Sequence, residues 1–351
     1  MDQQKFTGGL LAFLENSPTP FHAVDQLTGL LSAGGFVHLD ARQHDPGPGN
    51  YFPCRNGSSL IAFCHDGQPL TRLRLAGAHT DSPGFKIKPR PIRVKHGQVQ
   101  LGVEPYGSGL LGTWFDRDLS IAGRICWHDE QGEPHTSLID FRRPVAAIPS
   151  LAIHLNKEAN EGKPVNRQTD VVPLLMQTEE EEADFAAILK KRLMEEHRLT
   201  REPDILDHEL FVYDCQPPAR LGLQEDFIAG GRLDNLLSCY TLIQALVHND
   251  ARNALVVLND HEEVGSLSTT GAQGTFLQSV LDLLLPESRQ RHHCLGRSLF
   301  VSADNAHAVH PNFTDRHDQG HLPRMNRGPV IKYNANQRYA TSSATASFYR
   351  L

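Results

Sequence analysis

The sequence predicts an α/β fold in which a domain with a central β-sheet flanked by helices is interrupted by a β-rich insertion. Both ends of the chain alternate segments of helical periodicity with short apolar runs typical of buried strands. Between them, from about residue 95 to 224, short β-like runs are separated by Gly, Pro, Asp and Asn turns. We therefore expect residues 1–94 and 225–351 to form one α/β domain and residues 95–224 to form the insertion.

The first part of the α/β domain is expected to begin with an amphipathic helix. Its apolar face is formed by residues at helical spacing: Phe6, Leu10, Leu11, Phe13 and Leu14. The runs SSLIAFC (58–64) and LRLAGAH (73–79) are short and apolar, and they predict two buried strands.

The insertion is expected to contain several short strands and one helix. Three runs predict the strands: GQVQLGV (97–103), LSIAGRICW (119–127) and TSLIDF (136–141). The segment HDEQGEPH (128–135) predicts a hairpin turn between the last two. Thr178, with Glu181 three residues later, has the spacing of a capping box and predicts the start of a helix. The apolar face of this helix is formed by Phe185, Ile188, Leu189 and Leu193.

After Gly230 the alternation of helices and strands returns. Two segments predict helices and three predict strands: 233–248 and 275–285, then 253–258, 297–303 and 328–334. The last residues, SSATASFYRL (342–351), are typical of a helix that has just begun. Because they are apolar and carry no C-terminal capping signal, we expect the natural C-terminus to lie further on.

Composition argues against several classes of function. The 351 residues are 39% hydrophobic and 21% charged, and length alone suggests about two domains. The formal net charge is −7 and Lys and Arg are scattered, so we expect no nucleic-acid partner. No apolar run approaches the roughly 18 residues that span a membrane, and the first residues lack a secretory signal. The six cysteines are spread singly, which predicts reduced thiols in a cytoplasmic protein and neither disulfides nor a zinc knuckle.

Three of the predicted strands end at residues that commonly bind metals. His79 closes one strand, and Asp81 follows it two residues later. Glu262 and Glu263 follow the strand predicted after it, and Asp304 follows the third. Because sites in open parallel sheets form beyond the carboxyl ends of the strands, we expect these side chains to meet at one edge.

A fourth candidate, Asp234, stands at the start of a predicted helix. Imidazole and carboxylate groups together suit divalent metals, and a two-metal hydrolase needs a bridging carboxylate, terminal ligands and a separate base. Neighbouring side chains on an extended turn point in different directions, so Glu263 would bind metal and Glu262 would act as the general base. Asp81 would accept the second imidazole N–H of His79 and fix its tautomer.

Each motif alone has a simpler explanation. A single HxD or EE motif is most often a polar loop, and lone histidines such as His22, His307 and His310 are most often satisfied by ordinary hydrogen bonds. Four groups with metal-ligand chemistry, all at strand or helix ends, together favour a two-metal hydrolase.

Eight segments carry a family resemblance: SPTPFHAV (17–24), GAHTDSPGFKIKP (77–89), WFDRDLSIAGR (114–124), IPSLAIHLN (148–156), FIAGGRLDNLLSC (227–239), DHEEVGS (260–266), SADNAHAVHPN (302–312) and IKYNANQRYAT (331–341). They closely resemble the aspartyl aminopeptidases, cytoplasmic metallopeptidases of the co-catalytic zinc aminopeptidase group. The resemblance implies a zinc aminopeptidase-like catalytic domain and an inserted oligomerisation and lid domain. It also implies a homo-oligomer, a dodecamer, that removes N-terminal aspartate or glutamate from peptides with two Zn²⁺ ions per subunit.

The resemblance also implies roles for individual residues. His79 matches a terminal zinc ligand, and Asp234 matches the ligand that bridges the two ions. Glu262 matches the base that activates water. Glu263 matches the ligand of the second zinc ion, and Asp304 matches a ligand of the first.

Three further expectations come from the same resemblance. His154 matches a histidine that reaches the active site of a neighbouring subunit and helps to hold the substrate or the oxyanion; a plain hairpin residue is the alternative. Lys332 and Arg338 are candidates to bind the acidic side chain of the substrate; surface charge pairs are the alternative. The peptide bond Asp234–Asn235 is expected to be cis.

The chain departs from the family pattern at its end. The family carries a final histidine ligand, in an MHS-type context, beyond the last residue of this sequence. The second zinc ion would then be held by Glu263 and the shared Asp234 alone. Two alternatives therefore remain: an inactive or structural homologue, and a related metallohydrolase that acts on another amide or acyl substrate.

Overall fold

A computed structural model of the chain describes residues 2–40, 46–162, 164–248, 253–336, 339 and 341–350. The chain divides into two compact units, Met1–Asp304 and Asn305–Leu351. The first unit holds two large sheets, one mixed and one antiparallel, and almost all of the helices.

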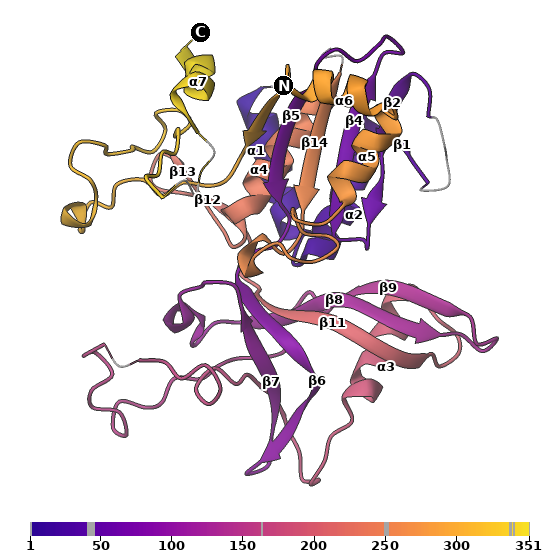
Figure 1. Ribbon diagram of the computed structural model, residues 1–351. Helices are drawn as coiled ribbons and strands as arrows, with labels where there is room; N and C mark the ends of the chain where they lie inside the picture. Colours follow the sequence, from indigo (N-terminus) through magenta and orange to yellow (C-terminus); the bar gives the residue numbers. More distant parts are fainter. Residues whose placement is uncertain are drawn as a thin grey trace. The chain divides into compact units, whose positions relative to one another are not determined.

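The first sheet of this unit has seven strands, and its middle is built from the predicted apolar runs (Figure 1). The order of six strands is β1-β2-β4-β14-β5-β15, and β3 pairs with β4. Strands β14, β5 and β15 run parallel to one another, whereas β4 is antiparallel to β14. The bounds are β1 (Val37–His38), β2 (Gly49–Phe52), β3 (Cys54–Arg55), β4 (Ser59–His65), β5 (Arg74–His79), β14 (Ala254–Asn259) and β15 (Leu299–Ser302).

Helices cover both faces of this sheet. Leu60 and Ala62 of β4 belong to a buried cluster with α1, α2 and α4, whereas Ile61 and Phe63 belong to a cluster with α5 and α6. The alternation follows from the strand period of two residues, and it makes β4 apolar on both sides. The helix bounds are α1 (Gln3–Glu15), α2 (Pro20–Ala33), α4 (Leu233–Val247), α5 (Phe276–Leu284) and α6 (Ser288–Leu295).

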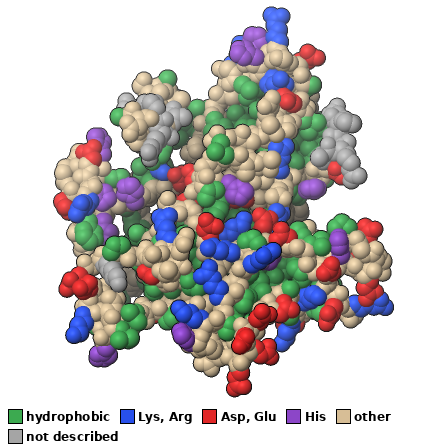
Figure 2. Space-filling view, turned by 60° about the horizontal axis from the view of Figure 1, so that its bottom comes forward, with side chains coloured by type: hydrophobic (Ala, Val, Ile, Leu, Met, Phe, Trp, Pro, Cys, Tyr) green, Lys and Arg blue, Asp and Glu red, His purple; other side chains and the backbone are tan. Residues whose placement is uncertain are grey.

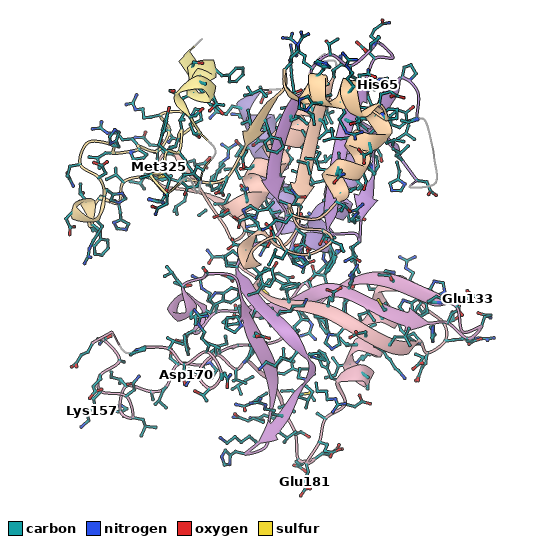
Figure 3. All side chains as sticks on the ribbon, in the orientation of Figure 1. His65, Glu133, Lys157, Asp170, Glu181 and Met325 are labelled. Carbon is teal, nitrogen blue, oxygen red and sulfur yellow. The ribbon has the colours of Figure 1, made fainter. Side chains whose placement is uncertain are left out.

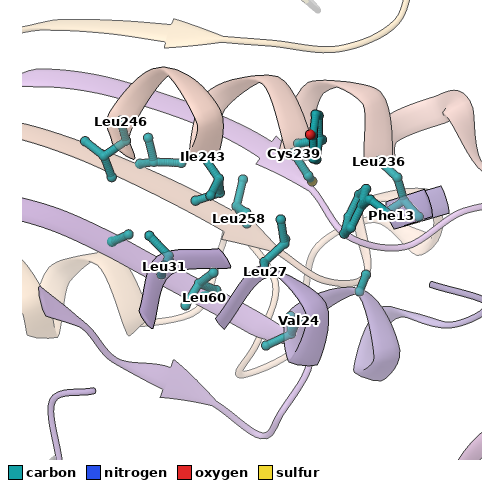
Figure 4. Close-up of a cluster of buried hydrophobic side chains, with 14 of the residues drawn as sticks. Phe13, Val24, Leu27, Leu31, Leu60, Leu236, Cys239, Ile243, Leu246 and Leu258 are labelled. Carbon is teal, nitrogen blue, oxygen red and sulfur yellow. The ribbon is translucent and has the colours of Figure 1, made fainter. Parts of the chain in front are cut away.

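The first of these clusters packs three helices against the sheet (Figure 4). Leu27 of α2, Ile243 of α4 and Leu258 of β14 are fully buried in it. Removing one such aliphatic side chain from water stabilises the fold by about 1.5–3 kcal/mol. The cluster therefore anchors α4, whose first turn carries Asp234, on strands that end at the other site residues.

Two of these helices lie outside the sequence-based expectations. Helix α2 has Thr19 as N-cap, whose side chain accepts from the N–H of His22, and Pro20 stands at its first position. Both features are typical of helix starts, so the start of this helix could have been predicted from the sequence. Helix α6 follows α5 after a short break, and its residues, SRQRHHCL, are mostly polar and give no apolar face to recognise.

The second sheet is antiparallel and contains the strands predicted for the insertion. Its order is β10-β7-β6-β11-β8-β9, and the hairpin turn between β8 and β9 lies where the sequence predicts it. The bounds are β6 (Gly84–Lys95), β7 (Gln98–Tyr106), β8 (Leu119–His128), β9 (Pro134–Asp140), β10 (Leu174–Gln177) and β11 (Asp204–Asp214). The domain boundaries at residues 94 and 224 stay a prediction. Short strands β12 (Ala219–Leu221) and β13 (Phe227–Ala229) follow the sheet as a pair.

The helix packed on the second sheet begins later than expected. It is α3 (Phe185–His197), and its N-cap is Asp184, whose side chain accepts from the N–H of Ala187. The prediction that Thr178 caps this helix is wrong, because Thr178 accepts from the N–H of Glu180 in a bend before it. Asp184 stands directly before the apolar face, and Asp is at least as favourable an N-cap residue as Thr.

The second unit contains little regular structure. The strand predicted at 328–334 is wrong: the structure assigns no strand there, and no strand among the described residues pairs with this segment. Tyr333 is 59% exposed, so the segment lacks both the ladder and the burial that stabilise a strand. The short helix α7 (Ser343–Ala346) is present where the sequence predicts one, with a capping box at Ser342 and Thr345.

Three further features accompany this fold. Within the described residues, no helix is long and apolar enough to cross a membrane. All six cysteines are free; two are buried and four are half-buried. On the face shown in Figure 2, basic and acidic side chains both occur, so neither sign of charge covers that face.

Candidate active site

The candidate site lies at the carboxyl ends of the three parallel strands. Asn259 of β14 stands opposite His79, the last residue of β5, and Ser302 of β15 stands opposite Gly77. The residues that follow β14 and β15 therefore leave the sheet at the same edge as His79. Glu262 and Glu263 begin a short 3-10 helix that starts three residues after the end of β14, and Asp304 follows β15 by two residues.

His79 is surrounded by carboxylates. Its Nε2 atom lies 3.5 Å from Asp234, 3.7 Å from Asp304 and 4.0 Å from Glu262. One ligand atom each from His79, Asp234 and Glu263 lie within 4.8 Å of one another. The structure thus brings together four residues predicted as metal ligands and the predicted base.

The carboxylates around His79 give the site an excess of negative charge, which shows in the pKa of the imidazole. Burial alone would lower the pKa of His79, but the carboxylates of Asp234, Asp304 and Asp81 outweigh burial and raise the pKa to about 12. A proton on the imidazole supplies positive charge that this cluster otherwise lacks. A divalent cation would supply the same compensation, and imidazole with several carboxylates is a ligand set that zinc accepts. The residues present therefore fit a metal centre.

Asp81 is a buried residue that holds several groups of the site in place. Its side chain is fully buried, and its two carboxylate oxygens accept the main-chain N–H groups of Glu262, at 3.2 Å, and Glu263, at 3.1 Å. The Nδ1 atom of His79 lies 3.0 Å from the main-chain oxygen of Asp81 and 3.3 Å from its carboxylate. Burial would raise the pKa of Asp81, but its hydrogen bonds with His79 and Tyr106 lower it overall, so the group stays ionised. Asp81 thus holds the imidazole through its main-chain oxygen and carboxylate, and holds the turn that carries the adjacent glutamates through the carboxylate.

Tyr106, at the end of β7, is a site residue that the sequence reading missed. Its hydroxyl donates to a carboxylate oxygen of Asp81 at 2.8 Å. The next residue, Gly107, has φ of +70°, and a Cβ atom there would come within 3.0 Å of the Cβ of Glu263. Gly107 therefore lets the chain leaving β7 pass close to Glu263.

Asp234 is held by contacts to its main chain and to its neighbour. The peptide bond Asp234–Asn235 is cis, as the family resemblance implies. The buried amide of Asn235 donates to the main-chain oxygen of Ala303 at 2.9 Å, which ties the first turn of α4 to the end of β15. The hydroxyl of Ser82 donates to the main-chain oxygen of Asp234 at 2.7 Å. These bonds leave the Asp234 carboxylate directed at His79.

The adjacent glutamates have different environments. The side chain of Glu262 is 55% exposed, which leaves room for water and substrate beside it. Burial, with smaller effects from neighbouring charges, raises the pKa of Glu263 to about 7. The extended turn assumed for this pair is wrong, because both residues lie on the 3-10 helix; one carboxylate is nevertheless open to solvent and the other is more buried.

Three further predicted site residues are His154, Lys332 and Arg338. His154 lies on an exposed turn between β9 and β10, and no contact joins it to the cluster within the described part of the chain. Lys332 belongs to the second unit, where its Nζ donates to the main-chain oxygen of Asn305 at 2.9 Å and lies 5.3 Å from the ring centre of Tyr339. Arg338 lies outside the described residues. The roles of these three residues stay predictions.

Comparison with known proteins assigns a family to this arrangement. A family model described as aminopeptidase I zinc metalloprotease (M18) matches residues 13–350. A probable M18 family aminopeptidase 2 from Stutzerimonas stutzeri (strain A1501) is 52% identical over 348 residues, which cover 97% of this chain and 81% of that protein.

Solved structures agree with this assignment. The chain is similar to a protein in the cryo-EM structure of the Ape4 and Nbr1 complex, with a TM-score of 0.93 and 36% identity over 99% of this chain and 72% of that chain. It is also similar to mApe1 of Chaetomium thermophilum, with a TM-score of 0.82 and 34% identity over 92% of this chain and 79% of that chain. The predicted α/β fold of the zinc aminopeptidase type is thereby confirmed.

Proposed function

This chain belongs to the M18 family of aminopeptidase I zinc metalloproteases and is a metalloaminopeptidase, and we propose that it removes N-terminal aspartate and glutamate from peptides by a two-metal mechanism. The family resemblance identified in the sequence is confirmed. The observation that carries the proposal is the convergence of His79, Asp234 and Glu263 within 4.8 Å, with Asp304 and Glu262 beside them.

The ligand arrangement suggests how two zinc ions would be divided. His79 and Asp304 would hold the first ion, Glu263 the second, and Asp234 would bridge them. Counting Asp234 for both ions, three of the described side chains would serve the first ion and two would serve the second. When bound, paired ions polarise the scissile carbonyl and lower the pKa of water.

The residues of the chain then share the remaining work. Glu262, on the exposed side of the pair, takes the proton of the attacking water and passes it to the leaving amine. Asp81 keeps the imidazole of His79 oriented and holds the turn that carries Glu262, so the base and the ligands keep a fixed separation. The free α-amino group of the substrate would bind near Glu263, which restricts cleavage to the first residue.

Selectivity for acidic residues is assigned to cations of the segment 331–341. Lys332 is an ammonium group close to an aromatic ring, and Arg338 stands six residues later. We expect Lys332→Met to lower kcat/KM for aspartyl and glutamyl substrates by about 10–200-fold while leaving leucyl and alanyl substrates within about twofold. Arg327→Met, an exposed cation of the same unit, is the matched control. An equal loss on all four substrates would refute this role.

The connection between β9 and β10 of the second sheet favours a homo-oligomer. The connection between β9 and β10 carries three exposed apolar residues: Leu151 at 57%, Ile153 at 52% and Leu155 at 76%. Figure 3 shows Lys157 and Asp170 on this connection, away from the strands. Exposed apolar side chains this close together are typical of subunit contacts. His154 lies among them, so a contact made by this connection would carry His154 to a neighbouring subunit.

Oligomerisation is tested by mass in solution. Leu155→Asp should reduce the molecular mass measured by light scattering from that of an oligomer, a dodecamer, to that of smaller species. Leu223→Asp, at a fully exposed site on another segment, should leave the mass unchanged. An oligomer that survives Leu155→Asp and Ile153→Asp together would contradict the proposal.

We place the protein in the cytoplasm, a location in keeping with its six free thiols.

A further inference from the structure

The loop at residues 265–274, which follows the adjacent glutamates, folds back over His261. The main-chain oxygen of His261 accepts from the N–H of Ser266 at 2.7 Å. The N–H of Asp260 donates to the main-chain oxygen of Thr270 at 3.2 Å. The loop is therefore closed on the two residues that precede the glutamates. His261 has no task in the mechanism proposed above, yet it lies directly before the proposed base.

The ring of His261 is the centre of a hydrogen-bonded group inside this loop. Its Nδ1 atom lies 2.6 Å from the hydroxyl of Ser268 and 3.2 Å from the hydroxyl of Thr270. The hydroxyl of Ser268 also accepts from the N–H of Gly271 at 3.0 Å. The Nε2 atom lies 3.5 Å from the carboxylate of Asp260, which favours the tautomer with its proton on Nε2. Nδ1 is then the acceptor for the hydroxyl hydrogen of Ser268.

The main chain of His261 is held in the left-handed conformation. It has φ of +62° and ψ of 24°, and the 3-10 helix begins with the next residue, Glu262. Positive φ is uncommon for residues other than glycine, although His is among those that adopt it more often, and it persists only where the surrounding structure enforces it. Here the bonds of the ring to Ser268 and of the main chain to Ser266 enforce it.

The position of the Glu262 carboxylate depends on its own main chain, because the side chain is 55% exposed. Asp81 holds the N–H groups of Glu262 and Glu263. His261 is the residue from which the chain enters the 3-10 helix, so its conformation sets the direction of that helix. A misplacement of about 1 Å can lower the rate of an enzyme about 100-fold. The conformation of His261 therefore bears directly on the work of Glu262.

We propose that His261 is a positioning residue: through the bond of its ring to Ser268, it fixes the 3-10 helix that presents Glu262 as base and Glu263 as metal ligand. This inference rests on the proposed function of the two glutamates. The same bonds could serve the stability of the loop alone. In that case their loss would lower only the free energy of unfolding, whereas a positioning role also requires a change in kcat and in zinc affinity while the chain is folded.

The double variant Ser268→Ala, Thr270→Val tests this role, because it removes both hydroxyls within reach of Nδ1. In the zinc-loaded full chain we expect kcat on an aspartyl peptide to fall about 10–100-fold, with KM within about threefold of the wild type. The dissociation constant for zinc should rise about tenfold. His261→Asn should keep kcat within about threefold, because its amide oxygen can accept in place of Nδ1 and Asn tolerates positive φ.

Ser298→Ala is the matched control. It also removes two hydrogen bonds, those with the N–H of Leu73 and the main-chain oxygen of Cys294, at the sheet edge opposite the site. Unchanged kcat and zinc affinity in the double variant, or equal losses in Ser298→Ala, would overturn the proposal.

Hydrogen exchange of the amides at residues 261–266 in the metal-free chain should be faster in the double variant than in the wild type and Ser298→Ala. Equal exchange in all three would also overturn the proposal. This measurement needs neither zinc nor turnover, so failure of the positioning role can be told apart from failure of the proposed peptidase function.

Discussion

The hydroxyl of Tyr106 lies 2.8 Å from a carboxylate oxygen of Asp81, so the antiparallel sheet is bonded to the residue that orients the predicted metal ligand His79. The same carboxylate also accepts the N–H groups of Glu262 and Glu263. A single phenol thus supports the imidazole and both glutamates through one intermediary. Groups that hold a ligating residue in place commonly change metal affinity when removed.

We expect Tyr106→Phe to weaken zinc binding and to lower kcat/KM, each by about 10–100-fold. The ring keeps its edge-to-face contact with Phe211, so only the hydroxyl is lost. Tyr213→Phe is a matched control, because Tyr213 donates to Asp140 at 2.6 Å away from the cluster. Both variants should lose about 1.5–3 kcal/mol of unfolding free energy, since each removes a hydrogen bond to a charged group. Equal zinc affinities in the two variants would refute a positioning role for Tyr106.

Glu262→Gln should separate metal binding from proton transfer. The amide keeps the shape of the side chain but cannot take a proton from water, so we expect turnover to fall by about 10²–10⁴-fold. Zinc content, measured by mass spectrometry of the metals, should remain that of the wild type. Asp282→Asn removes a carboxylate on α5 and should leave turnover unchanged. Retained turnover in Glu262→Gln would exclude this residue as the base.

Zinc binding should strengthen as pH rises. In the metal-free chain the neighbouring carboxylates raise the pKa of His79 to about 12, and burial raises the pKa of Glu263 to about 7. Zinc must displace both protons below pH 7 and one proton above it, so its apparent affinity should rise by about tenfold per pH unit for each proton. Calorimetry in buffers of different ionisation enthalpy counts the protons released. An affinity that is constant between pH 6 and 8 would contradict this assignment.

The same pKa shifts determine whether the metal-free fold becomes more or less stable as the pH rises. Both groups have a higher pKa in the folded chain than in the unfolded chain, so each binds its proton more tightly when folded. Their contribution to stability is complete at low pH and is lost as pH rises, through about 7 for Glu263 and about 12 for His79. Denaturant unfolding at pH 6 and pH 8 should show the decrease, and added zinc should reverse it.

The cluster beneath α4 should be sensitive to truncation. Leu27 is fully buried between helices, and Leu27→Ala leaves a cavity, so we expect a loss of about 2–5 kcal/mol in unfolding free energy. Leu151→Ala, at an exposed site, should change it by less than about 0.5 kcal/mol. Denaturant titration monitored by circular dichroism measures both. Similar losses in the two variants would show that this cluster does not stabilise the fold.

The sequence predicts the parts of the site that depend on strand ends. His79, Glu263 and Asp304 follow apolar runs, and parallel strands direct their carboxyl ends to one edge, so convergence could be inferred without coordinates. Tyr106 could not be inferred in this way. Its bond to Asp81 depends on how an antiparallel strand from the second sheet meets the first, and hydrophobic periodicity carries no information on that contact.

Local competition explains the errors in the predicted elements. Thr178 has a capping-box spacing, but Asp184 stands directly before the apolar face and caps α3 instead. The segment 328–334 has strand-like residues, yet a strand exists only where a partner supplies hydrogen bonds, and sequence pattern does not reveal the partner.

Zinc stoichiometry of Asp234→Asn tests the central claim most directly. If His79, Glu263 and Asp304 share this carboxylate between two ions, the wild-type chain should bind two zinc ions at saturation. Asp234→Asn should lose both high-affinity ions, because the bridge serves each of them, while Asp25→Asn on the exposed face of α2 should keep them. An Asp234→Asn chain that still binds zinc with wild-type stoichiometry and affinity would contradict the account.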